Sequence, residues 1–223
     1  MAILSNLDLV KRVPLFSNLN QLQASMVADS VSKHRFKRGE ALVSQGEKSG
    51  YLAIMLNGRA RVVATDSKGR EVILAHLEAG AHVGEMSLID DQPHSASVVA
   101  ETQTDALILG REAFMRCLAD SVPMAQTIMK GLVQRLRNAD EKIESLALLD
   151  VYGRVARALM ELGKANEDGT FVTQSRVSRQ DVAKMIGASR EMVSRVMKDF
   201  EERGIISTQE DGTLLVNARI QGL

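Results

Sequence analysis

Short apolar runs alternate with turn-forming segments along the chain from about residue 34 to residue 110. The apolar runs include YLAIML, ARVVAT and EVILAHL, and the segments between runs include KRGE, SQGEKSG, LNGR, DSKGR, EAGA and IDDQP. Turn residues at such close intervals are typical of many short strands. Because a parallel sheet would need a helix between successive strands, the pattern predicts an antiparallel sandwich or jelly roll.

A helical pattern follows from about Arg111 to Leu162 and is interrupted at DSVP, where Pro123 suits the first turn of a new helix. Apolar residues in the new helix are three and four apart, as at positions a and d of a heptad repeat. They are Met129, Leu132, Leu136, Ala139, Ile143 and Leu146. An isolated helix would leave this stripe in water, so the pattern predicts a parallel helix pair in a homodimer. Packing of the stripe on the β domain is the alternative.

The same heptad register assigns Arg135 to position g and Asp140 to the following position e. In a parallel pair of helices, position g of one chain faces the next position e of the other. The register therefore predicts a salt bridge between Arg135 of one chain and Asp140 of its copy.

Two capping residues predict a helix-turn-helix in the last third of the chain. Ser178 suits the N-cap of a helix that has Asp181 at its third position. Gly187 is expected to end this helix, and Ser189 suits the N-cap of a second helix. The spacing therefore predicts a helix, a tight turn and a second helix.

The second of these helices has one apolar side and one polar side when its residues are placed 100° apart. The apolar side holds Val193, Val196, Met197 and Phe200, and the polar side holds Arg190, Glu191, Ser194, Arg195 and Lys198. Gly204 is a natural end for the helix, and IISTQEDGTLLV then predicts two strands joined by a turn at Asp211 and Gly212. The combination predicts a winged helix-turn-helix.

Overall charge indicates no particular partner, because 28 Lys and Arg balance 28 Asp and Glu. Between Arg176 and Lys198, however, six basic residues face two acidic ones, a local net charge of +4. In the major groove an arginine can bond two acceptors on guanine, and a glutamate can accept from the amino group of cytosine. We therefore expect Arg190, Glu191 and Arg195 to contact bases; an ordinary solvated helix face is the alternative.

Residues at helix starts and flanks are expected to contact DNA phosphates, which strengthens binding without selecting a sequence. These residues are Arg179, Gln180, Ser189 and Lys198, and Ser194 on the polar side completes the predicted DNA-binding set.

Composition limits the remaining classes of protein. With 45% hydrophobic and 25% charged residues, the 223 residues suffice for one large or two modest globular domains. No apolar run is long enough to cross a bilayer, and MAILSNLDLVKRVPLF lacks the features of a secretory signal, so we expect a cytoplasmic protein without membrane contact. The single Cys117 excludes an internal disulfide, cannot alone hold an iron–sulfur cluster or structural zinc, and is expected to be a small buried hydrophobe.

The segment VSRQDVAKMIGASREMVSRVMKDFEERGII closely resembles the helix-turn-helix of the CRP/FNR family of bacterial transcription regulators. The resemblance extends upstream through EKIESLALLDVYGRVARAL, which is similar to the dimer helix and hinge of the family, and through the β region. It implies an α+β fold with three parts. They are an effector-binding antiparallel β jelly roll with flanking helices at 1–122, a dimerisation helix at 123–150 and a winged helix-turn-helix at 151–223.

The resemblance also implies the DNA target. In the family, the R-E-x-x-x-R residues of the second helix contact bases in TGTGA-like half-sites, and here they are Arg190, Glu191 and Arg195. A homodimer on a palindromic operator follows, with RNA polymerase as a candidate partner.

The family further implies a cyclic nucleotide in the jelly roll, near VGEMSLIDDQPHSASVVA. The residues that resemble its phosphate cassette are Gly84, Glu85, Met86 and Ser87. In such a cassette, backbone N–H groups hold an anion and Glu85 accepts from a ribose hydroxyl. Where cyclic AMP binders of the family have an Arg-Ser pair, this chain has His94 and Ser95, so a mostly neutral ring replaces a permanent cation.

Ala139 and Asp140 replace a Thr-Ser pair that meets adenine in the family. A carboxylate can accept both adjacent N–H groups of guanine, so Asp140 favours cyclic di-GMP as effector, with cyclic AMP next and no other cofactor. Arginines are candidates to hold its phosphates: Arg59, Arg61, Arg70, Arg135 and Arg137, of which we include Arg70 and Arg135 in the predicted site. Two alternatives stay open: Asp140 forms only the salt bridge to Arg135, or the pocket is vestigial and DNA binding needs no ligand.

An enzyme is the alternative from another class, because jelly rolls also form cupin metalloenzymes. His76, His82 and Glu85 are spaced six and three apart, but the histidines at 34, 76, 82 and 94 include no pair separated by one residue, as a cupin site expects. We therefore expect neither catalysis nor a bound metal. A regulatory module of a kinase or channel would share the β roll but lack the winged helix.

Overall fold

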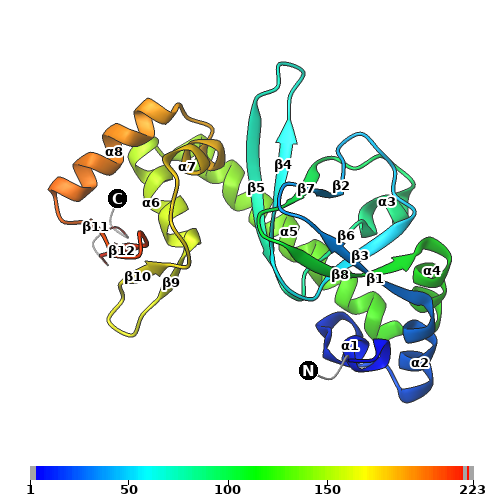
Figure 1. Cartoon of the computed structure of the whole chain (residues 1–223). Helices are drawn as coiled ribbons and strands as arrows, with labels where there is room; N and C mark the ends of the chain where they lie inside the picture. Colours follow the sequence, from blue (N-terminus) through cyan, green and yellow to red (C-terminus); the bar gives the residue numbers. More distant parts are fainter. Residues whose placement is uncertain (1–3, 218–219, 221–223) are drawn as a thin grey trace. The chain divides into compact units, whose positions relative to one another are not determined.

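The structure, a computed structural model, describes residues 4–217 and 220 (Figure 1). The chain forms two compact units, 1–135 and 136–223. The boundary between the units lies inside the long helix α5 (Val122–Leu148), so this helix contributes residues to both.

The first unit contains two four-stranded antiparallel sheets, as the predicted jelly roll requires (Figure 1). One sheet has the strand order β1-β8-β3-β6 and the other the order β2-β7-β4-β5. The strands are β1 (Val31–Phe36), β2 (Ala41–Val43), β3 (Tyr51–Met55), β4 (Arg59–Thr65), β5 (Glu71–Glu78), β6 (His82–Val83), β7 (Ser97–Ala100) and β8 (Thr104–Gly110). Leu42, Ala53 and Val98 are among the side chains from the two sheets that form one shared core.

The β1-β8-β3-β6 sheet has a second buried face, which helices cover. The helices of this unit besides α5 are α1 (Asn6–Arg12), η1 (Pro14–Phe16), α2 (Gln21–Ser30), α3 (Glu85–Asp90) and α4 (Arg111–Asp120). Leu52 and Ile54 of β3 pack with Phe114 of α4, whereas the alternate residues Ala53 and Met55 belong to the core between the sheets. A strand buried on both faces explains why YLAIML is an uninterrupted apolar run.

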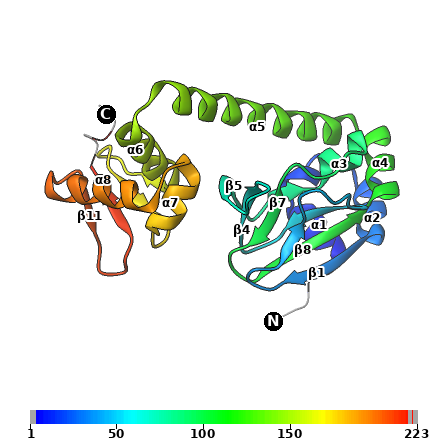
Figure 2. The same ribbon diagram turned by 90° about the horizontal axis from the view of Figure 1, so that it is seen from above.

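Helix α5 begins at the predicted break and continues without interruption for 27 residues (Figure 2). The Ser121 hydroxyl accepts from the Met124 N–H at 3.3 Å and so caps its start. Leu132 of the predicted stripe packs partly against the helix-covered core, and Ala139 is exposed. The larger stripe residues have high exposed fractions: 56% for Met129, 62% for Leu136, 65% for Ile143 and 57% for Leu146. The described chain therefore leaves most of the stripe in water.

The second unit is a winged helix-turn-helix, as predicted. Beyond α5 its elements are α6 (Val151–Leu162), β9 (Gly163–Ala165), β10 (Phe171–Thr173), α7 (Arg179–Ile186), α8 (Arg190–Glu202), β11 (Ile206–Thr208) and β12 (Leu214–Val216). The strands form one antiparallel sheet in the order β11-β12-β10-β9. Asp150 caps α6 by accepting from the Gly153 N–H at 2.9 Å, and Arg157 of α6 pairs with Glu141 of α5 at 3.1 Å.

Two strands of this sheet, β9 and β10, were not expected from the sequence. The hairpin that joins them contains Asp168 and Gly169, a strong turn signal, and Gly169 adopts a φ of +79°. Its flanking strands have only three residues each, too few to show an alternating pattern. Short strands of this kind are identified only by the partners they pair with.

Candidate functional site

Helices α7 and α8 begin at the residues that the sequence predicts. The Ser178 hydroxyl accepts from the Asp181 N–H at 3.2 Å, and the Ser189 hydroxyl accepts from the Met192 N–H at 3.2 Å. Between the two helices Gly187 has a φ of +64°, a left-handed conformation that favours glycine. The caps and the glycine together determine where the tight turn ends and α8 starts.

The two sides of α8 are separated as the 100° spacing predicts. Its buried residues are Val193, Val196, Met197 and Phe200. Arg190, Glu191, Arg195 and Lys198 are exposed and Ser194 is half-buried. Because the apolar side is anchored in the core of the unit, the guanidinium groups and the carboxylate are presented outward from a fixed helix.

The Glu191 carboxylate is held in its ionised form. Its own backbone N–H, the Ser189 hydroxyl and the charges of Arg190 and Arg195 lower the pKa of Glu191 below its ordinary value. A carboxylate in this state only accepts hydrogen bonds, so it suits an amino group on a base edge and repels a phosphate.

The residues predicted to contact phosphates lie on the exposed surface of α7 and α8. Arg179 is 3.7 Å from Glu201, and Lys198 is 3.6 Å from Glu202. Exposed pairs of this kind contribute about 0–1 kcal/mol, so exchange of the carboxylate for a phosphate costs little. Gln180 is exposed in the first turn of α7 and has no partner in the hydrogen bonds that the structure describes.

The cassette of the first unit begins at a residue where only glycine fits. Gly84 has a φ of +100°, and a Cβ atom there would lie 2.6 Å from the carbonyl oxygen of Tyr51. Helix α3 starts directly after it and has Glu85, Ser87 and Leu88 buried, while Met86 is exposed. The turn therefore directs the Glu85 side chain into the protein.

Glu85 is 1% exposed and forms an ion pair with a residue that lies fifty positions away. Arg135 Nη1 donates to Glu85 Oε1 at 2.5 Å, and Arg135 Nη2 donates to the carbonyl oxygen of His82 at 2.7 Å. Burial raises the pKa of Glu85, and the guanidinium opposes this rise. The sequence placed both residues in the effector site but did not predict that they bind each other.

Three residues of the predicted effector set contain buried polar atoms without a hydrogen-bond partner in the described structure. The atoms are Glu85 Oε2, Ser87 Oγ and His94 Nε2. Buried polar atoms are nearly always satisfied in folded proteins, so each unsatisfied one indicates a place for a polar ligand group or water. They provide acceptors or donors suited to hydroxyl and phosphate groups.

His94 is fixed by its backbone. Its N–H donates to the Glu47 carbonyl oxygen, and its own carbonyl oxygen accepts from the Gly46 N–H, both at 2.9 Å. Burial lowers the pKa of His94 below its ordinary value, although Glu47 opposes the shift. The ring is therefore neutral at pH 7, and Ser95 beside it is exposed.

Arg70, Ala139 and Asp140 of the predicted effector set have exposed positions. Arg70 lies in the exposed turn between β4 and β5, where its Nε donates to Asp66 at 2.7 Å. Ala139 and Asp140 are exposed on the part of α5 that belongs to the second unit. The predicted salt bridge between Arg135 and Asp140 of a second chain stays a prediction, and Glu85 of the same chain competes for Arg135.

The residues of the alternative cupin site have separate surroundings. His76 Nδ1 is 3.3 Å from Glu101, whereas the His82 ring lies against Gly131 of α5. Among residues 4–217 and 220, no three His, Cys, Asp or Glu side chains are placed to bind one metal ion. Within the same residues, no helix has the length and apolar content needed to span a membrane.

Comparisons with known proteins identify two domain families in the chain. The family model of the cyclic nucleotide-binding domain matches residues 33–121, and that of the Crp-like helix-turn-helix domain matches residues 153–219.

Whole proteins are also similar to this chain. The cAMP-activated global transcriptional regulator CRP of Salmonella typhimurium is 31% identical over 177 residues, which cover 78% of this chain and 84% of that protein. The CRP-like cAMP-activated global transcriptional regulator of Mycobacterium tuberculosis is 26% identical over 211 residues, 93% of this chain and 94% of that one. The structure of the c-di-GMP responsive global regulator CLP of Xanthomonas campestris superposes with a TM-score of 0.73 at 27% identity and covers 88% of this chain and 99% of that one.

The half-buried His82 is expected to make the first unit sensitive to acid. Burial, with a smaller effect of the Arg135 charge, lowers the pKa of His82 from 6.5 to about 4. Below about pH 6.5 the unfolded chain binds a proton that the folded chain does not bind until about pH 4, so stability falls as the pH decreases through this window. Between neutral pH and about pH 5 we expect a loss of about 2 kcal/mol from this residue.

Chemical denaturation of the wild type and of His82→Asn at these two pH values measures the effect. The variant should lose less stability on acidification by about this amount, whereas His34→Gln, which removes an exposed histidine, should behave like the wild type. Equal pH dependence of the wild type and His82→Asn would contradict the assignment.

Proposed function

Because this chain belongs to the CRP/FNR family of bacterial transcription regulators, we propose that it acts as a homodimer that binds a palindromic operator and responds to cyclic di-GMP. Family membership identifies a DNA-binding transcription regulator with a cyclic nucleotide-binding domain, and not an enzyme. In the proposed organisation, residues 1–122 bind the effector, residues 123–150 pair two chains and residues 151–223 bind DNA.

One observation carries the proposed mode of DNA binding: Arg190, Glu191 and Arg195 are exposed on α8, whose opposite side is buried. A helix fits the major groove, where the two guanidinium groups bond guanines and the carboxylate accepts from cytosine. A TGTGA-like half-site offers guanine on one strand and cytosine on the other, so it matches this set. Arg179, Gln180, Ser189 and Lys198 then bind phosphates on either side, and Ser194 lies against the groove.

The exposed stripe of α5 supports the homodimer. Its apolar side chains at Met129, Leu136, Ile143 and Leu146 recur at heptad spacing on the outside of a single chain. A second copy of the same helix covers such a stripe with matching knobs and holes. Two copies of α8 related by a twofold axis then contact half-sites about 34 Å apart, one turn of DNA.

The unsatisfied atoms of Glu85, Ser87 and His94 support a polar effector in the first unit. A neutral His94 attracts a single cyclic phosphate less than an arginine does, and Asp140 offers a carboxylate that suits guanine better than adenine. The relative from Xanthomonas campestris is described as c-di-GMP responsive, which favours the same effector here, and cyclic AMP, which activates the relative from Salmonella typhimurium, is the second candidate.

A vestigial pocket is the remaining alternative, and one contact favours it. Arg135 already donates to one carboxylate oxygen of Glu85, so the buried acid has a partner in the absence of a ligand hydroxyl. In that case DNA binding is independent of small molecules. RNA polymerase is a candidate partner with or without a ligand.

A residue that reads bases and a residue that binds phosphate should be distinguishable. Arg190→Ala is expected to weaken binding to the preferred operator by about 1–3 kcal/mol and to relax the preference at one base pair per half-site. Lys198→Ala is expected to weaken binding to all sequences alike and to reduce the slope of log K against log salt by about one for each phosphate that is no longer neutralised. Fluorescence anisotropy with operator and scrambled duplexes over a salt series measures both, and equal losses on both duplexes for Arg190→Ala would refute the division of roles.

A charge inside the stripe should separate the two chains. Ile143→Glu puts a carboxylate where two copies of α5 meet, and a buried unpaired charge costs several kcal/mol, so the dimer dissociation constant should rise by at least about a hundredfold. Arg137→Glu, which places the same group at an exposed outward position, is the matched control. Sedimentation equilibrium measures both variants, and an Ile143→Glu protein that remains dimeric would refute pairing through this stripe.

Calorimetric titration with cyclic AMP, cyclic GMP and cyclic di-GMP tests the effector. We expect cyclic di-GMP to bind, and Asp140→Ala to remove this binding while it leaves the dimer intact. Glu144→Ala, which removes a neighbouring exposed acid of α5, should have no effect. Absence of binding heat with all three nucleotides would favour the vestigial pocket. Binding of cyclic di-GMP to Asp140→Ala at wild-type affinity would show that Asp140 does not contact the ligand.

A further inference from the structure

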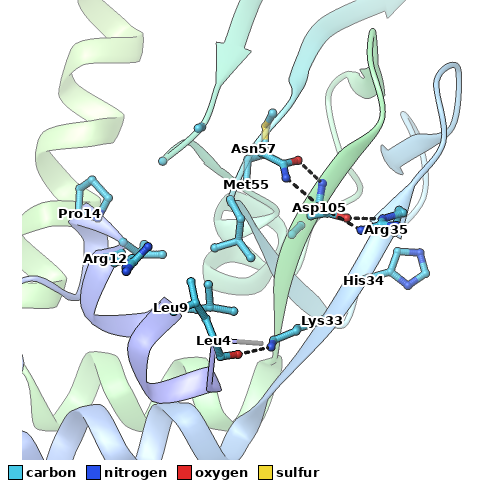
Figure 3. A pocket seen from close by; sticks show the side chains of 15 residues that line it. Leu4, Leu9, Arg12, Pro14, Lys33, His34, Arg35, Met55, Asn57 and Asp105 are labelled. Carbon is cyan, nitrogen blue, oxygen red and sulfur yellow. Dashed lines mark hydrogen bonds and ion pairs between the residues drawn. The ribbon is translucent and has the colours of Figure 1, made fainter. Parts of the chain in front are cut away.

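A groove of about 810 Å³ lies in the first unit, and none of its lining residues is predicted to bind DNA or an effector. It lies between α1 and η1 on one side and strands β1, β3 and β8 on the other (Figure 3). Its volume falls in the range of small-molecule sites, about 300–1,000 Å³. The lining residues that the argument uses are Leu9, Arg12, Lys33, Leu56 and Ala79.

The inner surface of the groove is apolar. Leu4, Leu9 and Leu56 are half-buried in its walls, and Ala79 is exposed at its edge. One end is closed where Gly80 approaches Pro14, since a Cβ atom at Gly80 would lie 3.5 Å from the proline ring. Removal of such an apolar surface from water is favourable, so an aliphatic group is expected to bind there.

Two cations lie on the rim of this apolar surface. Among the residues that the structure describes, Arg12 has no hydrogen-bond partner, and its charge acts on Asp8 from a distance. Lys33 Nζ donates to the carbonyl oxygen of Leu4 at 2.8 Å (Figure 3). An ammonium has three donors, so this one bond leaves Lys33 able to bind an anion as well.

The third cation of the lining is already neutralised. Arg35 Nε donates to Asp105 Oδ1 at 2.5 Å, and Asn57 Nδ2 donates to Asp105 Oδ2 at 2.8 Å. Figure 3 shows these three side chains together on the strand side of the groove, opposite Arg12 and Leu9 of α1. The charge that remains for a ligand is therefore the positive charge of Arg12 and Lys33.

We propose that this groove binds an alkyl carboxylate, a single aliphatic chain that ends in a carboxylate group. The chain lies along Leu9, Leu56 and Ala79, and the carboxylate accepts hydrogen bonds from Arg12 and Lys33 at the rim. Each half of the ligand matches one chemical property of the lining. A neutral alkane has no carboxylate to bind the two cations. A short anion has no alkyl chain to cover the apolar surface.

Other occupants fit this lining less well. A nucleotide needs a stacking partner, and the described residues that line the groove include no Phe, Tyr or Trp. An acidic peptide or an anionic bilayer presents similar chemistry and is separated from a free alkyl carboxylate by experiment.

Isothermal titration of the full-length protein with sodium decanoate, kept below its micelle concentration, tests the proposal. Decanoate should bind at one site per chain, butyrate and decyltrimethylammonium should not, and cyclic nucleotides should not compete. Absence of decanoate binding, or equal binding of decyltrimethylammonium, would overturn the proposal. Binding of phosphatidylglycerol vesicles or of a glutamate-rich peptide without binding of decanoate would also overturn it, because the site would then belong to a surface partner.

Variants locate the bound decanoate. Arg12→Ala should raise its dissociation constant about tenfold or more, since a hydrogen bond to a charged group is removed, whereas Lys11→Ala on the same helix but outside the groove should not. Ala79→Phe fills the groove from an exposed position and should abolish binding while operator affinity is retained. Unchanged binding in Arg12→Ala and Ala79→Phe would place decanoate elsewhere and so refute the site.

Discussion

The buried ion pair between Glu85 and Arg135 connects the effector cassette to the long helix. A carboxylate that is 1% exposed cannot remain ionised without a cation or several donors, so Arg135 must stay in place while Glu85 is charged and no other donor is present. Arg135 belongs to α5, which also carries the apolar stripe proposed to pair two chains. A ligand group that donates to Glu85 Oε2 would share the carboxylate charge with Arg135, which binds Oε1, and would so act on the helix that is proposed to set the distance between the DNA-binding units.

The helix-turn-helix was predictable almost residue by residue, because its determinants are local. Ser178, Gly187 and Ser189 act on backbone groups within three or four positions of themselves, and the two sides of α8 follow from a fixed rotation per residue. The β roll was predictable as a class for the same reason, since glycine-containing turns separate its strands. Its strand order, which places β8 between β1 and β3, depends on contacts far apart in sequence and was not predictable from any segment alone.

The candidate effector site shows the opposite case. The sequence assigned Glu85, His94, Arg70 and Asp140 to one effector site, but the structure gives each a different environment: a buried ion pair, a backbone-fixed neutral ring, an exposed turn and an exposed helix surface. The spacing of residues along the sequence does not reveal that Glu85 pairs with Arg135, fifty positions away. One physical signal was available, however: a carboxylate at the start of a buried segment needs a cation, and none follows it within that segment.

The central strands of the β1-β8-β3-β6 sheet are buried on both faces, because helices cover one face and the second sheet covers the other. Tolerated substitutions in these strands are therefore expected to be apolar residues of similar volume. The β2-β7-β4-β5 sheet is free of this restriction on its outer face, where Val72 and Leu74 of β5 are exposed. Divergence among distant homologues should accumulate on this sheet, so new regulatory contacts can evolve there while the inner sheet keeps the architecture constant.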